Sequence, residues 1–406
     1  MPSHVVQVTE PNFVVTYRFE TDTSFGGSGV VGLGGILADG VEFAQADNGE
    51  LLFRSIDFGA NGTEDELSRV DANGNVIGQV DLNALINPLL SGLTPATTIS
   101  IQDIEFDSQN RAVVIGQANH SAFGAGLTST QDFLIRVNTD GSLDTGLVVI
   151  GADEPVGDRF TPVPSRDEIL IDSHDRIIVS NATSATRLNP DGSTDTSFGN
   201  NGVTDLTVFE GVVDNFSGLE FAPDGSIIIL AGRPLSSSSP NAGSLFRLDA
   251  NGQIDFGFGQ GGRADIPLEA FTSSSAVFIV DDFAVDDSGR IVVAGLAEVT
   301  RFTADGQIDT SFGDNGTLTV PSNPALNNID DVAIDSQGNI VLSVGSGTVA
   351  RINSDGTFDA LFGTDGFQNL GDQFLLVEAL DFDDADRLIA SGSSPSGTAL
   401  GRFRLV

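Results

Sequence analysis

The phrase ATRLNPDGSTDTSFGNNG occupies residues 185–202, and close copies of it recur along the chain. The later copies are LFRLDANGQIDFGFGQGG (245–262), VTRFTADGQIDTSFGDNG (299–316) and VARINSDGTFDALFGTDG (349–366). Two eroded copies precede them, LSRVDANGNVIGQ (67–79) and LIRVNTDGSLDTG (134–146). One arginine marks each copy and a seventh place near the end: Arg69, Arg136, Arg187, Arg247, Arg301, Arg351 and Arg402, spaced by 67, 51, 60, 54, 50 and 51 residues. Such a period is typical of solenoids and propellers.

A second phrase falls between these copies and also occurs seven times. Its copies are VEFAQADNGELLF (41–53), IEFDSQNRAVVIG (104–116), ILIDSHDRIIVS (169–180), LEFAPDGSIIILAG (219–232), FAVDDSGRIVVAG (283–295), VAIDSQGNIVLSVG (332–345) and LDFDDADRLIASG (380–392). Each has two β-branched or aromatic runs around a tight polar turn, which predicts a β-hairpin. The arginine phrase adds a third strand, an Asp-Gly or Asn-Gly turn and a fourth strand. The sequence therefore predicts an all-β, seven-bladed propeller with four antiparallel strands per blade.

The two ends of the chain carry complementary halves of the repeat. YRFETDTSFGGSG (17–29) matches the fourth-strand half, and GRFRLV (401–406) matches the third strand. We therefore expect one domain over 1–406, closed by a 3+1 splice of N- and C-terminal strands that leaves no open edge. In this scheme 1–12 is a tail and 13–35 supplies the outer strand of blade 7. Blades 1 to 6 span about 37–371, and 373–406 forms the inner strands of blade 7. The Phe-Gly pair is missing after Asn75 and after Asp144, so the repeat does not define the fourth strands of those two blades.

The combined pattern R-[LFIV]-x-x-[DN]-G-x-x-D-x-x-F-G and F-D-x-x-G-x-I-x-V-x-G resembles the bacterial delta-60 repeat. This resemblance covers nearly the whole chain and implies a propeller within a large, often extracellular protein. It implies no catalytic residue set. More loosely, the four-strand layout is similar to NHL-type and gluconolactonase-type propellers, and the latter use a Ca²⁺ ion in the channel.

The composition excludes several classes of function. The chain has 57 Asp and Glu against 18 Lys and Arg, a net charge of −39, and all the cations are arginine. This charge repels nucleic acid and anionic lipid. With no Cys and three His, zinc and thiol chemistry are excluded, and we expect neither haem nor a nucleotide. Oxygen ligands for Ca²⁺ or Mg²⁺ remain.

Carboxylates stand just before the first strand of several blades, at Glu42, Asp103, Glu168, Asp282 and Asp331. First strands line the channel of a propeller, so these side chains would ring one mouth of it. Converging carboxylates raise one another's pKa unless a cation neutralises them, and Ca²⁺ fits such a site. The alternative is that they point to water in a chain that is acidic everywhere.

Two recurrent features have both a structural and a ligand-binding interpretation. The Asp-Gly turns resemble the alternating oxygens of a calcium loop, but they lack its glycine at position 6 and its glutamate at position 12; a hairpin turn is the simpler interpretation. The arginine column could line an anion site. Alternatively, each arginine stem packs over its neighbours while its guanidinium pairs with a turn or fourth-strand aspartate.

Three long insertions mark the expected working surface: 83–98, 117–132 and 233–244. We expect a protein or small-molecule ligand on this channel-mouth face of a monomeric, non-enzymatic binding or scaffold module, with Ca²⁺ at the mouth. The alternative is a Ca²⁺-dependent hydrolase or lactonase that uses the mouth carboxylates. His4, His120 and His174 belong to no catalytic motif.

The expected location is extracellular or at the cell surface. No apolar run is long enough to span a bilayer, and residues 1–13 lack the features of a signal peptide. The export expectation therefore rests on the resemblance. The acidic, lysine-free surface favours a saline habitat, because salt screens the repulsion between its charges.

Overall fold

The structure is a computed structural model of the 406-residue chain. It describes residues 17–34, 43–59, 62–90, 98–121, 128–150, 154–155, 168–180, 183–208, 215–232, 241–267, 280, 282–295, 297–321, 329–395 and 397–406.

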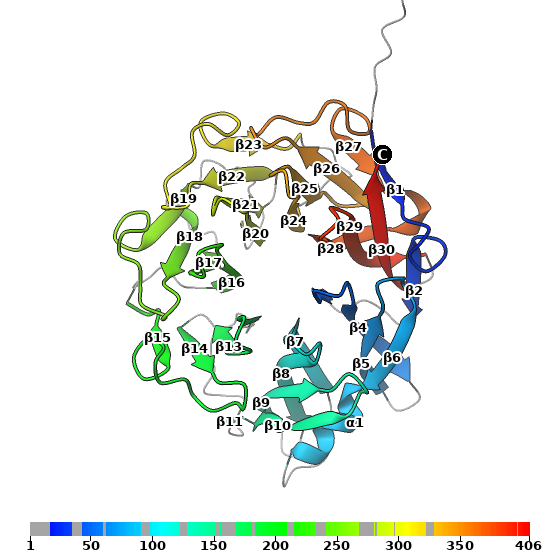
Figure 1. The fold of residues 1–406 in the computed structure, drawn as a ribbon, viewed down its shortest axis with the longest axis vertical. Coiled ribbons are helices and arrows are strands. Elements are labelled where there is room, and N and C mark those ends of the chain that lie inside the picture. The colour runs from blue at the N-terminus through cyan, green and yellow to red at the C-terminus, as the bar shows by residue number, and fades with distance from the viewer. Residues whose placement is uncertain are drawn as a thin grey trace, which may run out of the picture.

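Seven antiparallel sheets stand around a central axis, and the main path of each sheet has four strands (Figure 1). Blade 1 consists of β3 (Phe43–Gln45), β4 (Leu51–Gly59), β5 (Gly62–Val70) and β6 (Val76–Asp81). Blade 2 consists of β7 (Thr98–Phe106), β8 (Ala112–Ser121), β9 (Thr128–Val137) and β10 (Leu143–Ile150), with β11 (Glu154–Pro155) beside β9. Blade 3 consists of β12 (Glu168–Ile171), β13 (Ile177–Ser180), β14 (Ser184–Leu188) and β15 (Val203–Asp205), and blade 4 of β16 (Asn215–Phe221), β17 (Ile227–Gly232), β18 (Asn241–Leu248) and β19 (Arg263–Pro267).

The remaining blades follow the same plan. Blade 5 consists of β20 (Asp282–Val285), β21 (Ile291–Gly295), β22 (Glu298–Phe302) and β23 (Thr317–Thr319). Blade 6 consists of β24 (Asp331–Ile334), β25 (Ile340–Ser343), β26 (Thr348–Ile352) and β27 (Phe367–Asn369). Blade 7 consists of β28 (Leu376–Phe382), β29 (Leu388–Ser394), β30 (Gly397–Leu405), β1 (Phe19–Thr21) and β2 (Val30–Gly34). The first strand of each blade lies nearest the axis (Figure 1). The seven-bladed, four-stranded propeller predicted from the repeat is confirmed.

Blade 7 closes the ring with strands from both ends of the chain. Its outer strand is supplied in two pieces, because both β1 and β2 pair with β30. The backbone N–H of Arg18 donates to the carbonyl of Val406 at 3.0 Å, and the N–H of Val406 donates back at 2.9 Å. The 3+1 closure therefore ties the two ends together by a regular strand ladder.

The first hairpin of every blade uses a three-residue loop with a left-handed residue in its last position. In blade 2 the N–H of Asp107 donates to the carbonyl of Arg111 at 3.0 Å, and Asn110 has a φ of 57°. Asn, Asp and Gly tolerate this conformation best, which explains the polar residues of the repeat at this place. These turns and the third-to-fourth turns emerge together on one face of the ring, which we call the turn face.

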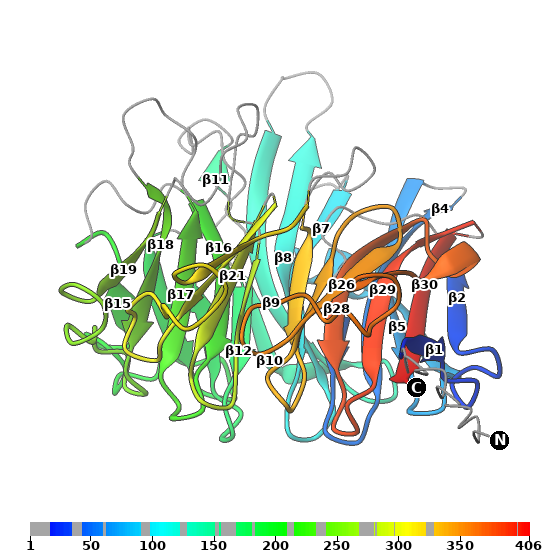
Figure 2. The ribbon, with the colours of Figure 1, turned by 90° about the horizontal axis from the view of Figure 1, so that it is seen from above.

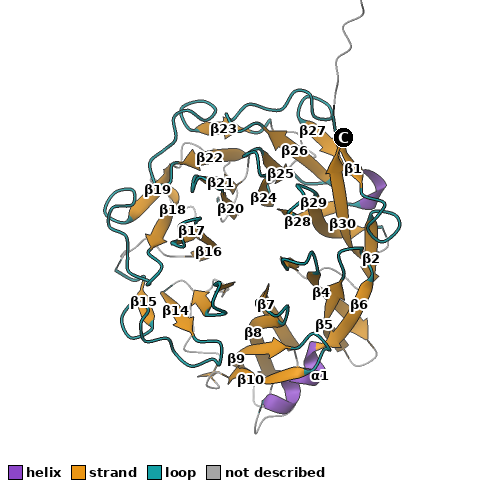
Figure 3. Ribbon diagram, viewed as in Figure 1, coloured by secondary structure: helices purple, strands orange, loops and turns teal. Residues whose placement is uncertain are grey.

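The fourth strand is reached in two different ways (Figure 3). In blades 3 to 7 the chain first makes tight turns around the Phe-Gly pair; in blade 3 Phe198 is buried and the N–H of Gly199 donates to the carbonyl of Asn251 in blade 4 at 2.7 Å. In blades 1 and 2, β6 and β10 follow the Asn-Gly or Asp-Gly turn almost directly. The two blades that lack Phe-Gly thus still have fourth strands, and in β10 the buried Leu147 is the apolar anchor.

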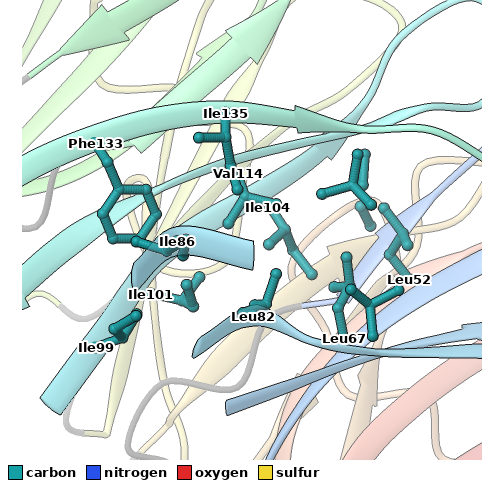
Figure 4. Packing of buried hydrophobic residues seen from close by; sticks show 14 of the residues in the cluster. Leu52, Leu67, Leu82, Ile86, Ile99, Ile101, Ile104, Val114, Phe133 and Ile135 are labelled. Carbon is teal, nitrogen blue, oxygen red and sulfur yellow. The ribbon is translucent and has the colours of Figure 1, made fainter. Parts of the chain in front are cut away.

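A short helix fills the core between blades 1 and 2. In α1 (Leu82–Ile86) the side chains of Leu82 and Ile86 are fully buried, and they pack against Ile101 and Ile104 of β7 (Figure 4). The 3₁₀ helices η1 (Asn87–Leu89) and η3 (Gly371–Gln373) are single turns. Within the described ranges, no helix is long and apolar enough to cross a bilayer.

Candidate functional site

The acids of the first strands occupy two positions that the first hairpin turn defines. Four residues before the turn-opening residue stand Glu42, Asp103, Glu168, Gly218, Asp282, Asp331 and Ala379. Two residues before it stand Ala44, Glu105, Leu170, Glu220, Ala284, Ala333 and Asp381. Because side chains alternate along a strand, both positions lie on the same face of each blade. Blades 4 and 7, which lack an acid at the first position, carry one at the second.

Acids at the first position link neighbouring blades. The carboxylate of Asp103 accepts the N–H of Ile169 in blade 3 at 2.7 Å and the N–H of Ile104 in its own strand at 2.7 Å. The carboxylate of Asp282 accepts the N–H of Val332 in blade 6 at 3.1 Å. Asp331 accepts the N–H of Leu380 in blade 7 in the same way. These carboxylates therefore face the next blade and join its first strand to their own.

The second position repeats this arrangement in blade 4. Glu220 accepts a hydrogen bond from the backbone of Val285 in blade 5, two residues further along that strand than the contact made from the first position. In blade 7 the carboxylate of Asp381 accepts the N–H of Phe382 in its own strand at 2.7 Å. Sequence reasoning missed Glu220 and Asp381. The signal that could have found them is that an acid appears two residues later wherever the first position loses one.

The environment of these acids favours their protonated forms. Burial, then the neighbouring charge of Asp282 and a hydrogen bond shared with it, raise the pKa of Asp331 well above its usual range. Burial also raises the pKa of Glu220, with Asp282 and Asp381 adding repulsion. Part of the surface of Asp381 is accessible to solvent. The many protein atoms around its carboxyl group nevertheless weaken its solvation, and this burial raises its pKa to about 6.

The described acids do not gather around one point. Among the residues that the structure describes, no three His, Asp or Glu side chains lie close enough to hold a metal ion. Glu168 is the first residue of β12 and is half-buried, and Glu42 lies outside the described residues. A Ca²⁺ ion at this mouth would therefore need ligands beyond Asp103, Glu168, Asp282 and Asp331. The calcium site stays a prediction.

The arginine column is structural, as the second interpretation expected. In blade 3, Arg187 is almost fully buried, its Nε lies 2.8 Å from Asp195 at the start of the fourth-strand segment, and its guanidinium carbon lies 4.7 Å from the centre of the Phe198 ring. The pKa of Asp195 falls to about 2, chiefly through the hydrogen bond from the Ser197 hydroxyl and also through Arg187. Blade 5 repeats the pairing between Arg301 and Asp309 at 2.8 Å.

Two of the three segments that were predicted to be ligand-binding loops have a different structure. Segment 83–98 begins as α1 and η1, and its Ile86 and Leu90 are buried in the core, so this part is not an exposed ligand-binding loop. Segment 117–132 is mostly strand, because β8 runs to Ser121 and β9 begins at Thr128. Of segment 233–244, residues 233–240 lie outside the described residues, and β18 begins at Asn241.

A family model described as a domain of unknown function (DUF5122) beta-propeller matches residues 113–147, 179–198, 222–258 and 287–312. These stretches lie in blades 2 to 5, and the match agrees with the propeller fold. Among curated proteins, none matches the sequence significantly.

Several solved propellers have a similar overall arrangement. The Dos1 propeller gives a TM-score of 0.49 at 10% identity and covers 96% of this chain and 95% of its own. BamB from Moraxella catarrhalis gives 0.47 at 12% identity, with 93% and 91% covered. XC5397 from Xanthomonas campestris, a gluconolactonase, gives 0.38 at 17% identity, with 72% and 90% covered. All three scores lie below 0.5.

Proposed function

We propose that this chain is a monomeric, non-enzymatic binding module built from delta-60-type repeats, and that it belongs to an exported bacterial protein. The observation that carries the proposal is the use made of the inner acids. Asp103, Asp282 and Asp331 accept backbone N–H groups of the next blade, so these carboxylates serve to hold the ring together. A rigid ring of this kind is suited to presenting a surface to a partner.

The docking surface in this proposal is the face opposite the turn face. Figure 2 shows the hairpin of β8 and β9 rising above its neighbours on that side. Its ladder extends from Ala112 opposite Val137 to Ser121 opposite Thr128, whereas the corresponding ladder of blade 3 ends at Ser180 opposite Ala185. A strand-built projection of this kind holds a surface in place better than a loop of the same length would.

The test separates cohesion of the ring from catalysis. Asp103→Ala leaves two backbone N–H groups without their acceptor and should lower the free energy of unfolding by about 2 kcal/mol, measured by urea denaturation. Asp103→Asn, which keeps an acceptor oxygen, is the matched control and should lose less. A panel of esters and lactones with added CaCl₂ should show no turnover above buffer. Turnover that disappears in Asp331→Asn would contradict the proposal.

A Ca²⁺-dependent hydrolase or lactonase is the second candidate, and one observation favours it. Asp331 shares a hydrogen bond with Asp282 and has a pKa raised well above its usual range, which favours a retained proton, as a general acid needs. The substrate panel above decides between the two functions. If the second candidate holds, Asp282→Asn and Asp331→Asn each abolish turnover, while Asp103→Asn retains it.

Calcium binding at the mouth is tested separately. Terbium luminescence sensitised by Tyr17 would report only an ion bound near that residue. The primary measurement is therefore the melting temperature of the protein with EDTA and with added CaCl₂. A site using Asp282 and Asp331 predicts that Ca²⁺ raises the melting temperature and that Asp282→Asn removes this rise. An unchanged melting temperature in both solutions would remove calcium from the proposal.

A further inference from the structure

Six of the seven column arginines donate to a backbone carbonyl of the next blade. The pairs are Arg69 with Asn110, Arg136 with Pro190, Arg187 with Ala250, Arg247 with Ala304, Arg301 with Ser354 and Arg402 with Ala72. In five of these pairs the acceptor belongs to the turn between the third and fourth strands of the next blade. The repeat thus supplies five of the guanidinium groups with a carbonyl oxygen from this turn, and Arg69 uses the first hairpin turn of blade 2.

Among the described residues, Arg351 of blade 6 has no carbonyl partner of this kind. In blade 7 the third strand β30 ends at Leu405, and β1, the first piece of the outer strand, begins at Phe19. The guanidinium of Arg351 pairs instead with Asp335 and Asp359. Its Nε has no hydrogen-bond partner among the described residues, whereas the Nε of Arg187 and of Arg301 each bind an aspartate.

A cavity of about 430 Å³ lies at this seam, on the turn face. Arg351, Arg387 and Arg404 contribute to its lining, and so do the rings of Phe19 and Phe382, whose centres are 6.4 Å apart. Its size falls in the range of small-molecule sites, which combine apolar walls with a few convergent polar groups.

Cations outnumber anions immediately around Asp22. Its carboxylate is shared by three guanidinium groups, at 3.0 Å from Arg402, 3.4 Å from Arg387 and 3.5 Å from Arg404. One carboxylate does not neutralise three cations, although Arg387 also pairs with Asp383 at 2.6 Å. The side chain of Arg404 is 55% exposed and has the longest of the three contacts, so it is the arginine most available to a ligand.

The other acids near this cavity already have partners. Asp335 pairs with Arg351 at 3.0 Å, and Asp386 accepts the backbone N–H of Ser336 at 2.9 Å together with its hydroxyl. Glu20, which stands opposite Arg404 in the ladder, pairs with Arg18 at 2.6 Å. The two acids of the lining are thus already bound, and Arg404 is the group of this seam that an anion can approach.

We propose that the cavity binds a small carboxylic acid with an apolar body. Its carboxylate is held by Arg404 and Arg387, since guanidinium groups match carboxylates bidentately. Its apolar body packs against Phe19 and Phe382. The cavity lies on the turn face, opposite the projecting hairpin of blade 2, so the inference does not rest on the proposed function.

A corresponding crevice between blades 3 and 4 serves as an internal comparison. It encloses about 370 Å³ and is lined in part by Arg187 and His174. There Arg187 has its full set of partners, because Nη1 donates to the carbonyl of Ala250 at 2.7 Å and Nε to Asp195 at 2.8 Å. The repeat is intact at that interface, and we expect no carboxylate site in it.

The chain carries its own reporter for this experiment. Tyr17 is the single tyrosine in a chain without tryptophan, and the guanidinium carbon of Arg351 lies 5.7 Å from the centre of its ring. Titration of the full chain with cyclohexylacetate, which does not absorb where tyrosine is excited, should change the Tyr17 emission saturably. Burial of its cyclohexyl ring should make this ligand bind at least about tenfold more tightly than acetate or inorganic phosphate.

Matched arginine variants locate the site. Arg387→Ser removes an arginine that is 30% exposed and pairs with Asp383, and Arg290→Ser removes its counterpart in blade 5, which is 31% exposed and pairs with Asp286. Arg387→Ser and Arg404→Ser should weaken binding by about tenfold. Arg290→Ser should leave it unchanged. Thermal unfolding of each variant checks that the ring remains folded.

Three results would overturn the proposal. One is the absence of a saturable signal from cyclohexylacetate up to about 50 mM, which corresponds to a binding free energy weaker than about −2 kcal/mol. Another is binding of phosphate as tight as that of cyclohexylacetate, which would show that the cavity recognises negative charge and not the apolar body of the ligand. The third is an equal loss of affinity in Arg290→Ser, which would show a general effect of surface charge.

Discussion

Blades 1 and 2 and blades 3 to 7 reach the same four-stranded sheet by different chain paths. Blades 3 to 7 insert the Phe-Gly segment, and its glycine bonds to the next blade: Gly313, for example, donates to the carbonyl of Asp355 at 2.9 Å. Blades 1 and 2 omit the segment and place apolar side chains against the next turn, such as Val80 near Gly141. The difference teaches that the repeat phrase encodes contact between blades, whereas the strands form without it.

The largest difference should appear at the turn glycines. In Gly356→Ala the new Cβ would lie 2.3 Å from the backbone nitrogen of Gly313, and the φ of 83° is already unfavourable for alanine. We expect a loss of about 3 kcal/mol or more in the free energy of unfolding, because the backbones of two blades must separate. Gly141→Ala has the same φ of 83° but meets only the Val80 side chain at 3.0 Å, so about 1 kcal/mol is expected. Urea denaturation measures both, and equal losses would break the comparison.

The second-largest difference between the two groups of blades should appear when the aspartate of an arginine–aspartate pair is removed. Asp309→Ala leaves Arg301, whose side chain is 3% exposed, without its carboxylate, and about 3 kcal/mol of stability should be lost. In blade 2 the guanidinium of Arg136 also lies 3.8 Å from Asp107, so Asp144→Ala leaves it a second carboxylate. About 1 kcal/mol is expected there. A larger loss for Asp144→Ala than for Asp309→Ala would contradict this assignment.

Salt should act on the surface of all blades but not on these buried pairs. The net charge of −39 destabilises the compact state, and screening it from 10 mM to 2 M NaCl should raise the melting temperature by about 5 °C. The gap between wild type and Asp309→Ala should stay constant, because a buried pair is screened little. Differential scanning calorimetry measures both, and a flat wild-type response would argue against a saline habitat.

The smallest effect should come from the inner strands. Asp381 has a pKa raised to about 6, so its contribution to stability is present below its unfolded pKa and is lost as the pH rises through 6. The opposite holds for Asp195, whose lowered pKa of about 2 means that stability is lost only as the pH falls toward that value. Asp381→Asn should therefore raise the melting temperature at pH 7 by about 2 °C and leave it unchanged at pH 4. A gain at both values would assign the effect to packing.

The repeat was sufficient to predict the number of blades, the closure and the pairing of arginine with aspartate, because these follow from residues at fixed spacing. The role of the inner acids was not predictable in the same way. Alternation places Asp103 and Glu105 on one face of a strand, but it does not say whether that face meets the channel or the next blade. Only the positions of the Ile169 and Val332 N–H groups decide this.

The insertions show what a different use of the sequence could have found. Leu82, Ile86 and Leu90 recur every four residues and are all buried, which is a helical period within a segment interpreted as a loop. The Ser, Thr and Gln residues of segment 117–132 gave no such signal, because the long ladder of β8 and β9 follows from backbone pairing and not from apolar alternation. The cavity at the seam was beyond prediction, since side chains from both ends of the chain line it.

The closure in blade 7 sets the order in which the protein can fold during synthesis. The carboxylate of Asp22 accepts from Arg402, which leaves the ribosome 380 residues later. Blades 1 to 6 contain their own four strands and can form one after another as the chain emerges, whereas β1 and β2 have no partner until β30 appears. The early strands therefore have no strand partner until the residues of β30 have been synthesised. The ring is completed in a single late step of very high contact order.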